Sequence, residues 1–169
     1  MSDTITSKLT IGIATFNSSE VIGNCLQSII SNYGDSVKII VADNNSTDST
    51  HEIITSRFPQ VQVYNSGANY GFGYSVNSIV GHSETPFVLI LNADIELQAG
   101  TIEPLIEALE KEDSLIVAAP VTFDKSGKLE GNIRRFPTVL RQFSESILGG
   151  SISRKINLSE TIDDDSSYL

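Results

Sequence analysis

The stretch VKIIVADNNSTD, residues 37–48, decides the fold because it joins an apolar run directly to a cluster of turn-forming residues. Only Lys38 interrupts the apolar run that ends at Ala42, and such a run is typical of a strand covered on both faces. Asp48 or Ser49 would then cap a following helix, because short polar side chains satisfy the free amides at a helix start. A buried strand followed at once by a helix indicates an α/β protein.

Short apolar runs and helical patterns alternate on both sides of this stretch. Further strands are predicted at residues 9–14, 61–64, 87–91 and 115–119. Further helices are predicted after a cap at Ser18 or Ser19, at residues 74–80, after a cap at Thr101 and at residues 138–148. Strand–helix units in series favour a mainly parallel sheet with helices on both faces, so the predicted fold class is α/β and Rossmann-like.

Length, composition and charge limit the classes of function. The 169 residues suit one domain, and the 40% of apolar residues argue against a disordered chain. The net charge of −10, with no basic stripe, excludes a nucleic-acid groove, which needs clustered Lys and Arg. The single cysteine, Cys25, excludes an internal disulfide and is predicted to be a buried thiol.

The extent of the folded domain and the cellular location of the protein are predicted from composition and from the length of the apolar runs. Residues 1–150 are expected to form the folded domain, and residues 151–169 a polar, acidic tail that is poorly ordered. Apolar runs such as residues 87–91 are too short to cross a bilayer, and residues 1–8 lack the pattern of a signal peptide. We therefore expect a cytoplasmic protein.

Residues suited to chemistry gather at the predicted strand ends. In open parallel sheets the ligand binds outside the carboxyl ends of the strands, which indicates the loops 15–19, 43–48 and 92–94. Asp94 follows the most apolar strand, where a fixed carboxylate suits Mg²⁺ or Mn²⁺ bound together with substrate phosphates; an ordinary turn is the alternative. Asp43 suits a hydrogen bond to a ribose hydroxyl or a helix-capping turn, and both interpretations stay open.

Several nucleotide and nucleophile motifs are missing from the sequence. No G-x-x-x-x-G-K-[ST] loop occurs, which excludes a P-loop site, and no G-x-S-x-G elbow indicates a serine nucleophile. Gly71 and Gly73 begin a G-x-G-x-x-G pattern, but Val76 occupies its third glycine position, so a dinucleotide-binding site is disfavoured. Arg134 suits contact with a phosphate, although a surface arginine is the commoner explanation.

Taken together and in order, five segments resemble motifs of the family 2 glycosyltransferases, over about residues 8–140. The segments are IGIATFN at 11–17, IVADNNSTD at 40–48, NYGFGYSVN at 69–77, LNAD at 91–94 and RRFPT at 134–138. The last three resemble the rhamnosyltransferase-like branch of that family, with Ala93 where the branch has proline. Their order and spacing are more specific than any single motif.

The resemblance implies a GT-A fold for residues 1–150 and inverting transfer of a sugar from a nucleoside-diphosphate donor to an acceptor hydroxyl. It implies Mg²⁺ or Mn²⁺ held by Asp94, dTDP-rhamnose or a UDP-sugar as donor, and a saccharide or lipid-linked acceptor. It also implies a cytoplasmic location, either free or peripheral at the inner membrane face. By residue-by-residue match, the donor-binding residues are Thr15, Phe16, Asn17, Asp43, Asn45, Ser46, Asn69, Gly71, Phe72, Gly73, Asn77, Asn92, Asp94 and Arg134.

The roles implied for these residues follow the motifs. Residues 15–17 would line the base pocket, Asp43 would bond the base or ribose, and residues 69–77 would shape the donor site under the diphosphate. Asn92 stands where many relatives have the first aspartate of a D-x-D motif, so one carboxylate fewer is present for the metal.

The sequence also departs from the family at its C-terminal end. The acidic motif that contains the family's general base is missing, so the catalytic base is unassigned and this chain is expected to bind donor but to transfer poorly. A non-catalytic nucleotide- or sugar-binding domain is the alternative function. A sugar-1-phosphate nucleotidyltransferase is disfavoured because residues 15–18 are neither glycine-rich nor basic. Apolar surface left open by a missing part would favour a homodimer.

Overall fold

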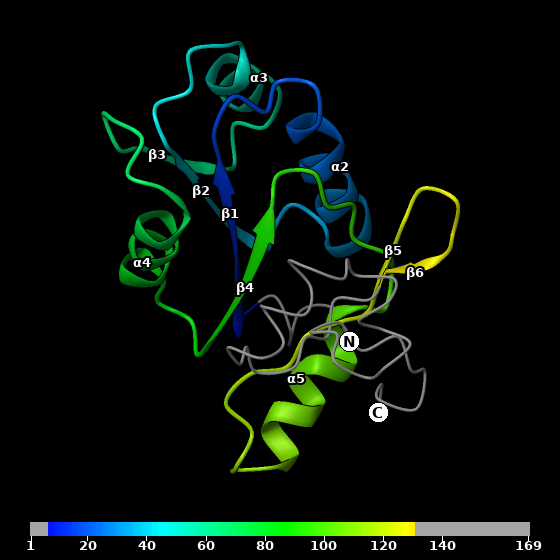
Figure 1. Cartoon of the computed structure of the whole chain (residues 1–169). Helices are drawn as coiled ribbons and strands as arrows, with labels where there is room; N and C mark the ends of the chain where they lie inside the picture. Colours follow the sequence, from blue (N-terminus) through cyan, green and yellow to red (C-terminus); the bar gives the residue numbers. More distant parts are fainter. Residues whose placement is uncertain (1–6, 131–169) are drawn as a thin grey trace, which may run out of the picture. The chain divides into compact units, whose positions relative to one another are not determined.

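A computed structural model describes residues 7–130 of the chain (Figure 1). Arg134, the helix predicted at 138–148 and the tail at 151–169 lie outside these residues. The chain divides into two compact units, Met1–Ala118 and Ala119–Leu169. The elements of the first unit are β1 (Leu9–Thr15), α2 (Ile22–Tyr33), β2 (Lys38–Asp43), α3 (Thr50–Arg57), β3 (Gln62–Asn65), α4 (Phe72–His82), β4 (Phe87–Asn92) and α5 (Ile102–Lys111).

The four strands of the first unit form one parallel sheet in the order β3-β2-β1-β4. The register places Thr15 opposite Asp43, and Ala14 opposite Asn92. The carboxyl ends of β1, β2 and β4 are therefore level, so the polar residues that follow them meet at one edge of the sheet.

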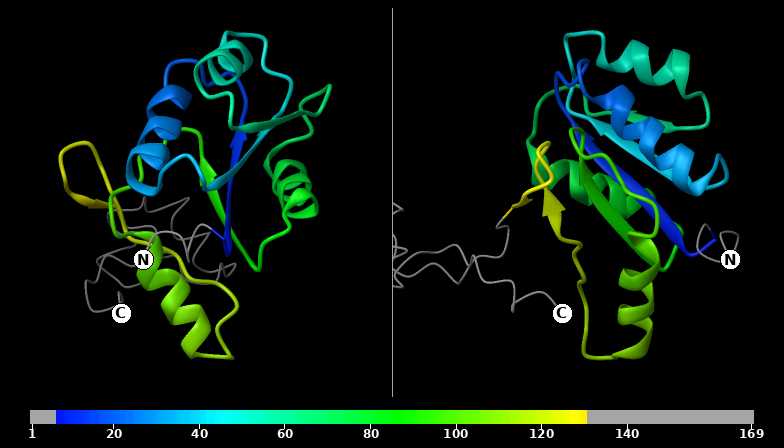
Figure 2. Two further views of the ribbon diagram at one scale, coloured as in Figure 1. Left: turned by 180° about the vertical axis from the view of Figure 1, so that it is seen from behind. Right: turned by 90° about the vertical axis from the view of Figure 1, so that its right-hand side faces the viewer.

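Helices cover both faces of this sheet, as the sequence predicted (Figures 1 and 2). Because side chains alternate along a strand, Ile11 and Ile13 join a large core with α2, α3 and α5, and Gly12 faces the opposite side. On that side α4 packs its fully buried Ile79 against β1 and β2. The buried thiol of Cys25 on α2 confirms another expectation.

The strand predicted at residues 115–119 is wrong. This segment has no regular secondary structure, and the side chain of Ile116 is 88% exposed. An apolar run becomes a strand only when a neighbour takes its backbone hydrogen bonds, and within residues 7–130 the edge strand β4 pairs with β1 alone. The second unit instead contains a short antiparallel pair, β5 (Thr122–Phe123) and β6 (Leu129–Glu130).

Ser49 and Thr101 are the N-cap residues of α3 and α5, as predicted, but neither makes a side-chain cap hydrogen bond, and the cap predicted at Ser18 or Ser19 is wrong. The N-cap of α2 is Val21 instead. The hydroxyl of Ser18 donates to the carbonyl of Phe16, and that of Thr101 donates to the carbonyl of Gln98. These hydroxyls therefore satisfy loop carbonyls instead of helix amides.

Candidate functional site

A pocket of about 520 Å³ opens at the carboxyl ends of β1 and β4. Its walls come from the loop between β1 and α2, the loop after β4, and one residue of the loop after β2. The lining residues are Ala14, Phe16, Asn17, Ser18, Ser19, Glu20, Val21, Asp48, Asn92, Ala93 and Asp94. We call this the β1–β4 pocket. Among the described residues that line it, three are carboxylates and none is Lys or Arg, so this wall of the pocket is acidic and would repel an anion that arrives without a cation.

Asn17 joins the loop after β1 to the loop after β2. Its backbone has a φ of 49°, the left-handed region that asparagine tolerates better than most residues. The Asn17 amide N–H donates to Ser46 Oγ at 2.9 Å, and its side-chain oxygen accepts from the amide of Thr47 at 2.8 Å. Asn17 therefore holds two walls of the site together as well as lining the pocket.

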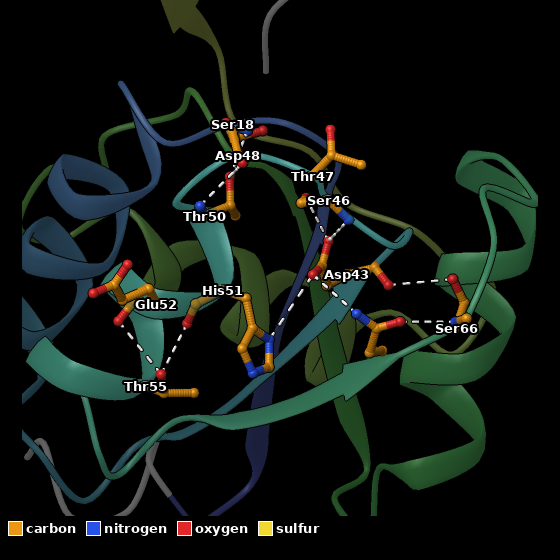
Figure 3. Close-up of polar contacts among 12 residues, drawn as sticks. Ser18, Asp43, Ser46, Thr47, Asp48, Thr50, His51, Glu52, Thr55 and Ser66 are labelled. Atoms are coloured by element: carbon orange, nitrogen blue, oxygen red, sulfur yellow. Dashed lines mark hydrogen bonds and ion pairs between the residues drawn. The ribbon is translucent and has the colours of Figure 1, made fainter.

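Asp43 is fully buried, and its carboxylate is held by hydrogen bonds (Figure 3). Ser46 donates to Oδ1 from both its amide and its hydroxyl, at 3.0 and 2.6 Å. Asn65 donates to Oδ2 at 3.4 Å, and Nδ1 of His51 lies 4.0 Å from the same oxygen. A buried carboxyl group is costly unless its oxygens find hydrogen-bond partners, so the Ser46 and Asn65 contacts fix the position of the Asp43 side chain.

Asp43 also lines a second, smaller pocket of about 180 Å³ between β2, β3 and α4. Tyr64 and His82 stack there with ring centroids 3.9 Å apart, and Tyr74 completes an aromatic wall. The remaining lining residues are Ala42, Asn65, Ser66, Ser75 and Ser78. Asp43 thus lines the aromatic pocket and not the β1–β4 pocket.

Asp48 connects the start of the β1–α2 loop with the start of α3. Its carboxylate accepts the amide of Ser19 at 3.0 Å and both the amide and the hydroxyl of Thr50. Partial desolvation raises the pKa of Asp48, but these hydrogen bonds outweigh it and hold the pKa well below the ordinary value for aspartate. Asp48 is therefore an anion at neutral pH on the wall of the β1–β4 pocket.

Asn92 and Asp94 lie side by side on the wall that follows β4, and both are exposed. Within residues 7–130, no three His, Cys, Asp or Glu side chains are grouped to hold a metal by themselves. A single carboxylate on an open pocket still fits Mg²⁺ or Mn²⁺, because these ions take one or two carboxylates and complete their shell with phosphate oxygens and water. The donor set therefore fits a metal that binds together with a diphosphate.

The other predicted residues lie outside the β1–β4 pocket. Thr15 is buried, and its hydroxyl has no hydrogen-bond partner among the described residues. Asn69 accepts the amide of Gly71, whose φ of 84° begins the turn into α4. Asn45, Asn69, Gly71, Phe72, Gly73 and Asn77 line neither pocket. Ser46 bonds both Asp43 and Asn17, and Arg134 lies outside the described residues.

Sequence reasoning missed the roles of three residues of the site. Asp48 was predicted as a helix cap and as the end of the loop 43–48, but its role in holding the β1–α2 loop, through a contact with Ser19 that spans 29 residues of sequence, was not predicted. Glu20 and His51 carried no signal, because an isolated acid and an isolated histidine are common on surfaces. The position of Asp48 inside the D-N-N-S-T-D turn was the one available hint.

Comparisons with known proteins agree on one family. A sequence profile of Glycosyl transferase family 2 matches residues 10–165. The chain is 28% identical over 124 residues to the N-acetylglucosaminyl-diphospho-decaprenol L-rhamnosyltransferase of Mycobacterium tuberculosis (strain H37Rv), which covers 67% of this chain and 40% of that protein. It is 31% identical over 133 residues to the SPbeta prophage-derived glycosyltransferase SunS of Bacillus subtilis, and this match covers 77% of this chain and 31% of that protein. The chain therefore spans less than half the length of these relatives.

Solved structures are similar in fold. S. aureus TarS 1-349 in complex with UDP-GlcNAc superposes with a TM-score of 0.61 at 21% identity, over 80% of this chain and 38% of that one. The mannosyltransferase PcManGT from Pyrobaculum calidifontis, in complex with GDP-Man and Mn2+, superposes with a TM-score of 0.55 at 23% identity, over 60% of this chain and 32% of that one. The predicted GT-A fold is confirmed. Among the residues described, no helix is long and apolar enough to span a membrane.

Proposed function

The chain belongs to glycosyl transferase family 2, and from this premise we propose that it binds a nucleoside-diphosphate sugar and transfers the sugar to an acceptor hydroxyl with inversion. The observation that carries the proposal is the β1–β4 pocket. It brings Phe16 and Asn17, which follow β1, to the same cavity as Asn92 and Asp94, which follow β4. These are four of the residues that the family motifs indicate.

We assign different parts of the donor to different elements. Asp43, whose carboxylate is oriented by Ser46 and Asn65, would accept a hydrogen bond from the base or the ribose. Phe16 is 44% exposed and offers an aromatic face to the same ligand. Asp94 and Asn92 would face the diphosphate from the opposite wall.

A divalent cation fits between the acidic pocket and the diphosphate. Asp94 would hold it, with Asn92 as a neutral neighbour. When bound, Mg²⁺ or Mn²⁺ neutralises the charge that develops on the leaving diphosphate. One structural neighbour, PcManGT, was solved in complex with both GDP-Man and Mn2+, which supports this choice of ion.

Relatives suggest the chemical class of donor and acceptor. One is named a rhamnosyltransferase acting on N-acetylglucosaminyl-diphospho-decaprenol, and a structural neighbour binds UDP-GlcNAc. We therefore propose dTDP-rhamnose or a UDP-sugar as donor and a saccharide or lipid-linked saccharide as acceptor. A cytoplasmic location, at or near the inner membrane face, would suit a lipid-linked acceptor, and a homodimer is part of the same proposal.

A non-catalytic donor-binding domain is the second candidate function. Inversion requires a general base that takes the proton of the acceptor hydroxyl during a single in-line attack. No residue of the given sequence is assigned as this base. Binding of donor without transfer is the outcome that distinguishes this candidate from the first.

Calorimetric titration of UDP, dTDP and their sugars, with Mn²⁺ and with EDTA, tests the donor site. We expect binding that depends on Mn²⁺ and that Asp94→Ala weakens at least about tenfold, the loss typical for one charged ligand. Glu96→Ala is the matched control, because Glu96 is an exposed carboxylate two residues away that does not line the pocket. If the folded wild type binds none of these nucleotides, the proposed function is wrong.

A further inference from the structure

Helix α2 carries polar side chains that contact the segment containing the proposed metal ligand. Ser28 and Asn32 are neighbours on one face of the helix, because residues four positions apart lie one above the other, and Tyr33 follows Asn32 at the end of the helix. Each of them bonds to the backbone between β4 and the first residue of α5. That segment begins with Asn92 and contains Asp94.

The contacts meet at Leu97, which is 5% exposed. Ser28 Oγ accepts the amide of Leu97 at 2.9 Å and donates to the carbonyl of Cys25 at 2.7 Å. Asn32 Nδ2 donates to the carbonyl of Leu97 at 2.8 Å. Both backbone groups of a buried residue are therefore satisfied by side chains of α2, where a strand neighbour would normally serve.

We call the contacts of Ser28 and Asn32 with Leu97 the Leu97 clamp, and Tyr33 extends this clamp toward α5. Its hydroxyl accepts the amide of Ile102 at 3.2 Å and lies 3.4 Å from the carbonyl of Gln98. At the other end, the Cys25 thiol lies 3.8 Å from the carbonyl of Asn92. The whole segment from β4 to α5 is thus attached to one helix.

The same helix begins at the opposite wall of the β1–β4 pocket. Ser18 to Val21, which line that wall, lead directly into α2. Asp94 lies three residues before the clamped Leu97. Because a three-residue chain can span roughly 10 Å, release of Leu97 would remove the hydrogen-bonded anchor nearest to Asp94 on its C-terminal side, leaving the Tyr33 contacts farther along the segment. The position of one pocket wall relative to the other therefore depends on the clamp.

We propose that Ser28 and Asn32 are positioning residues for Asp94, holding its loop at the separation from the β1–α2 wall that a metal-bound diphosphate requires. The role of these residues in metal and donor binding rests on the proposed function. The hydrogen bonds of the clamp are a feature of the structure and do not depend on that function. A purely structural role predicts a loss of stability alone, whereas a positioning role predicts a selective loss of the metal-dependent part of nucleotide binding.

Two pairs of matched variants separate these roles. Ser28→Ala removes the acceptor of the Leu97 amide, and Ser31→Ala makes the same change at an exposed position of the same helix. Asn32→Asp keeps the size but replaces the donor to Leu97 with an acceptor, and Asn24→Asp makes the same change in charge at another exposed position of α2. Ser28→Thr restores the hydroxyl and should restore binding.

Hydrogen exchange of the ligand-free protein is the first measurement. Peptides covering residues 93–101 should exchange at least about tenfold faster in Ser28→Ala and Asn32→Asp than in wild type, since each change leaves a buried backbone group unpaired. The two control variants should exchange like wild type. Unchanged exchange in both clamp variants would overturn the proposal, whatever the nucleotide data show.

Titration of UDP and dTDP into the same proteins, below the unfolding transition, is the second measurement. In Mn²⁺ the Kd should rise about three- to tenfold in both clamp variants, and in EDTA it should stay at the wild-type value. Equal changes in Mn²⁺ and EDTA, or no change in either, would refute the positioning role. A wild type that binds no nucleotide would refute the proposed function and the positioning role with it, while exchange still decides whether the clamp exists.

Discussion

Alanine at Gly12 should force helix α4 away from the sheet, and the contacts around Gly12 give the size of the effect. A Cβ atom at Gly12 would lie 2.3 Å from Cγ2 of Ile79 and 3.2 Å from the Cδ1 atoms of Ile79 and Ile90. Ordinary van der Waals contact begins at 3.4 Å, so the backbones must separate by about 1 Å. Ile79 is fully buried, so its side chain cannot move out into solvent to relieve the contact.

The expected loss of stability is about 1–2 kcal/mol. Overpacking a tight core costs about 1–3 kcal/mol, and replacing glycine by alanine within a strand returns about 0.5–1 kcal/mol. Gly81→Ala is the matched control, because Gly81 lies in α4 with nothing within 4 Å of the position that a Cβ would take, and it should gain up to about 1 kcal/mol.

Urea denaturation of a double-mutant cycle tests the reasoning. Ile79→Ala alone should cost about 2–5 kcal/mol, because it leaves a cavity in the core. In the double variant the new methyl group at Gly12 occupies part of that cavity, so the total loss should fall short of the sum by at least about 1 kcal/mol. Free energies that add to within about 0.5 kcal/mol would refute a direct contact between these positions.

The remaining predictions concern ionisable groups beside the site. Desolvation raises the pKa of Asp48, but hydrogen bonds from Thr50 and Ser19 lower it overall, so its ionised form stabilises the fold above about pH 4 and this contribution is lost as the pH falls further. The stability difference between wild type and Asp48→Asn, measured by urea denaturation, should therefore shrink below about pH 4; a constant difference would contradict this. Burial, with the nearby charges of Asp94 and Glu96, raises the pKa of the Cys25 thiol to about 12, so iodoacetamide near pH 8 should modify the native protein far more slowly than the urea-unfolded one. Equal rates in the two states would show that the thiol is accessible.

The sheet could be predicted from sequence because its strands are covered on both faces. Residues 9–14 and 37–42 are apolar almost without interruption, and in the structure their side chains alternate between the core shared by α2 and α3 and the core under α4. The strands then run parallel because a helix connects each strand to the next one in the sequence. That order places the polar residues at one edge, where the β1–β4 pocket is found.

The wrong predictions of a strand at residues 115–119 and of a helix cap at Ser18 have a common physical cause. Residues 115–119 have the apolar composition of a strand, but composition does not say whether a neighbouring strand is present to pair with. Ser18 has the side chain of a helix cap, but its hydroxyl bonds the nearby carbonyl of Phe16. In both cases the outcome depended on partners that local sequence does not specify.

The site was predicted where residues follow strands directly and missed where they act across loops. Asp43 and Asp94 follow β2 and β4, so strand prediction alone brought them to the correct edge. Asp48 and His51 come after a turn, and their contacts with Ser19 and Asp43 depend on how that turn folds. Periodicity carries no information about such contacts, which is why the contacts of Asp48 and His51 became known only with the structure.

The charge of the β1–β4 pocket restricts how a donor can bind. Glu20, Asp48 and Asp94 line it, and among the lining residues no basic side chain opposes them. A diphosphate entering alone would meet like charge from three carboxylates, one of which is held ionised by hydrogen bonds to fixed neighbours. If the pocket binds a diphosphate as proposed, a cation that arrives with it or before it would offset this charge, and affinity for a nucleotide sugar should then depend on the metal far more than affinity for the neutral nucleoside does.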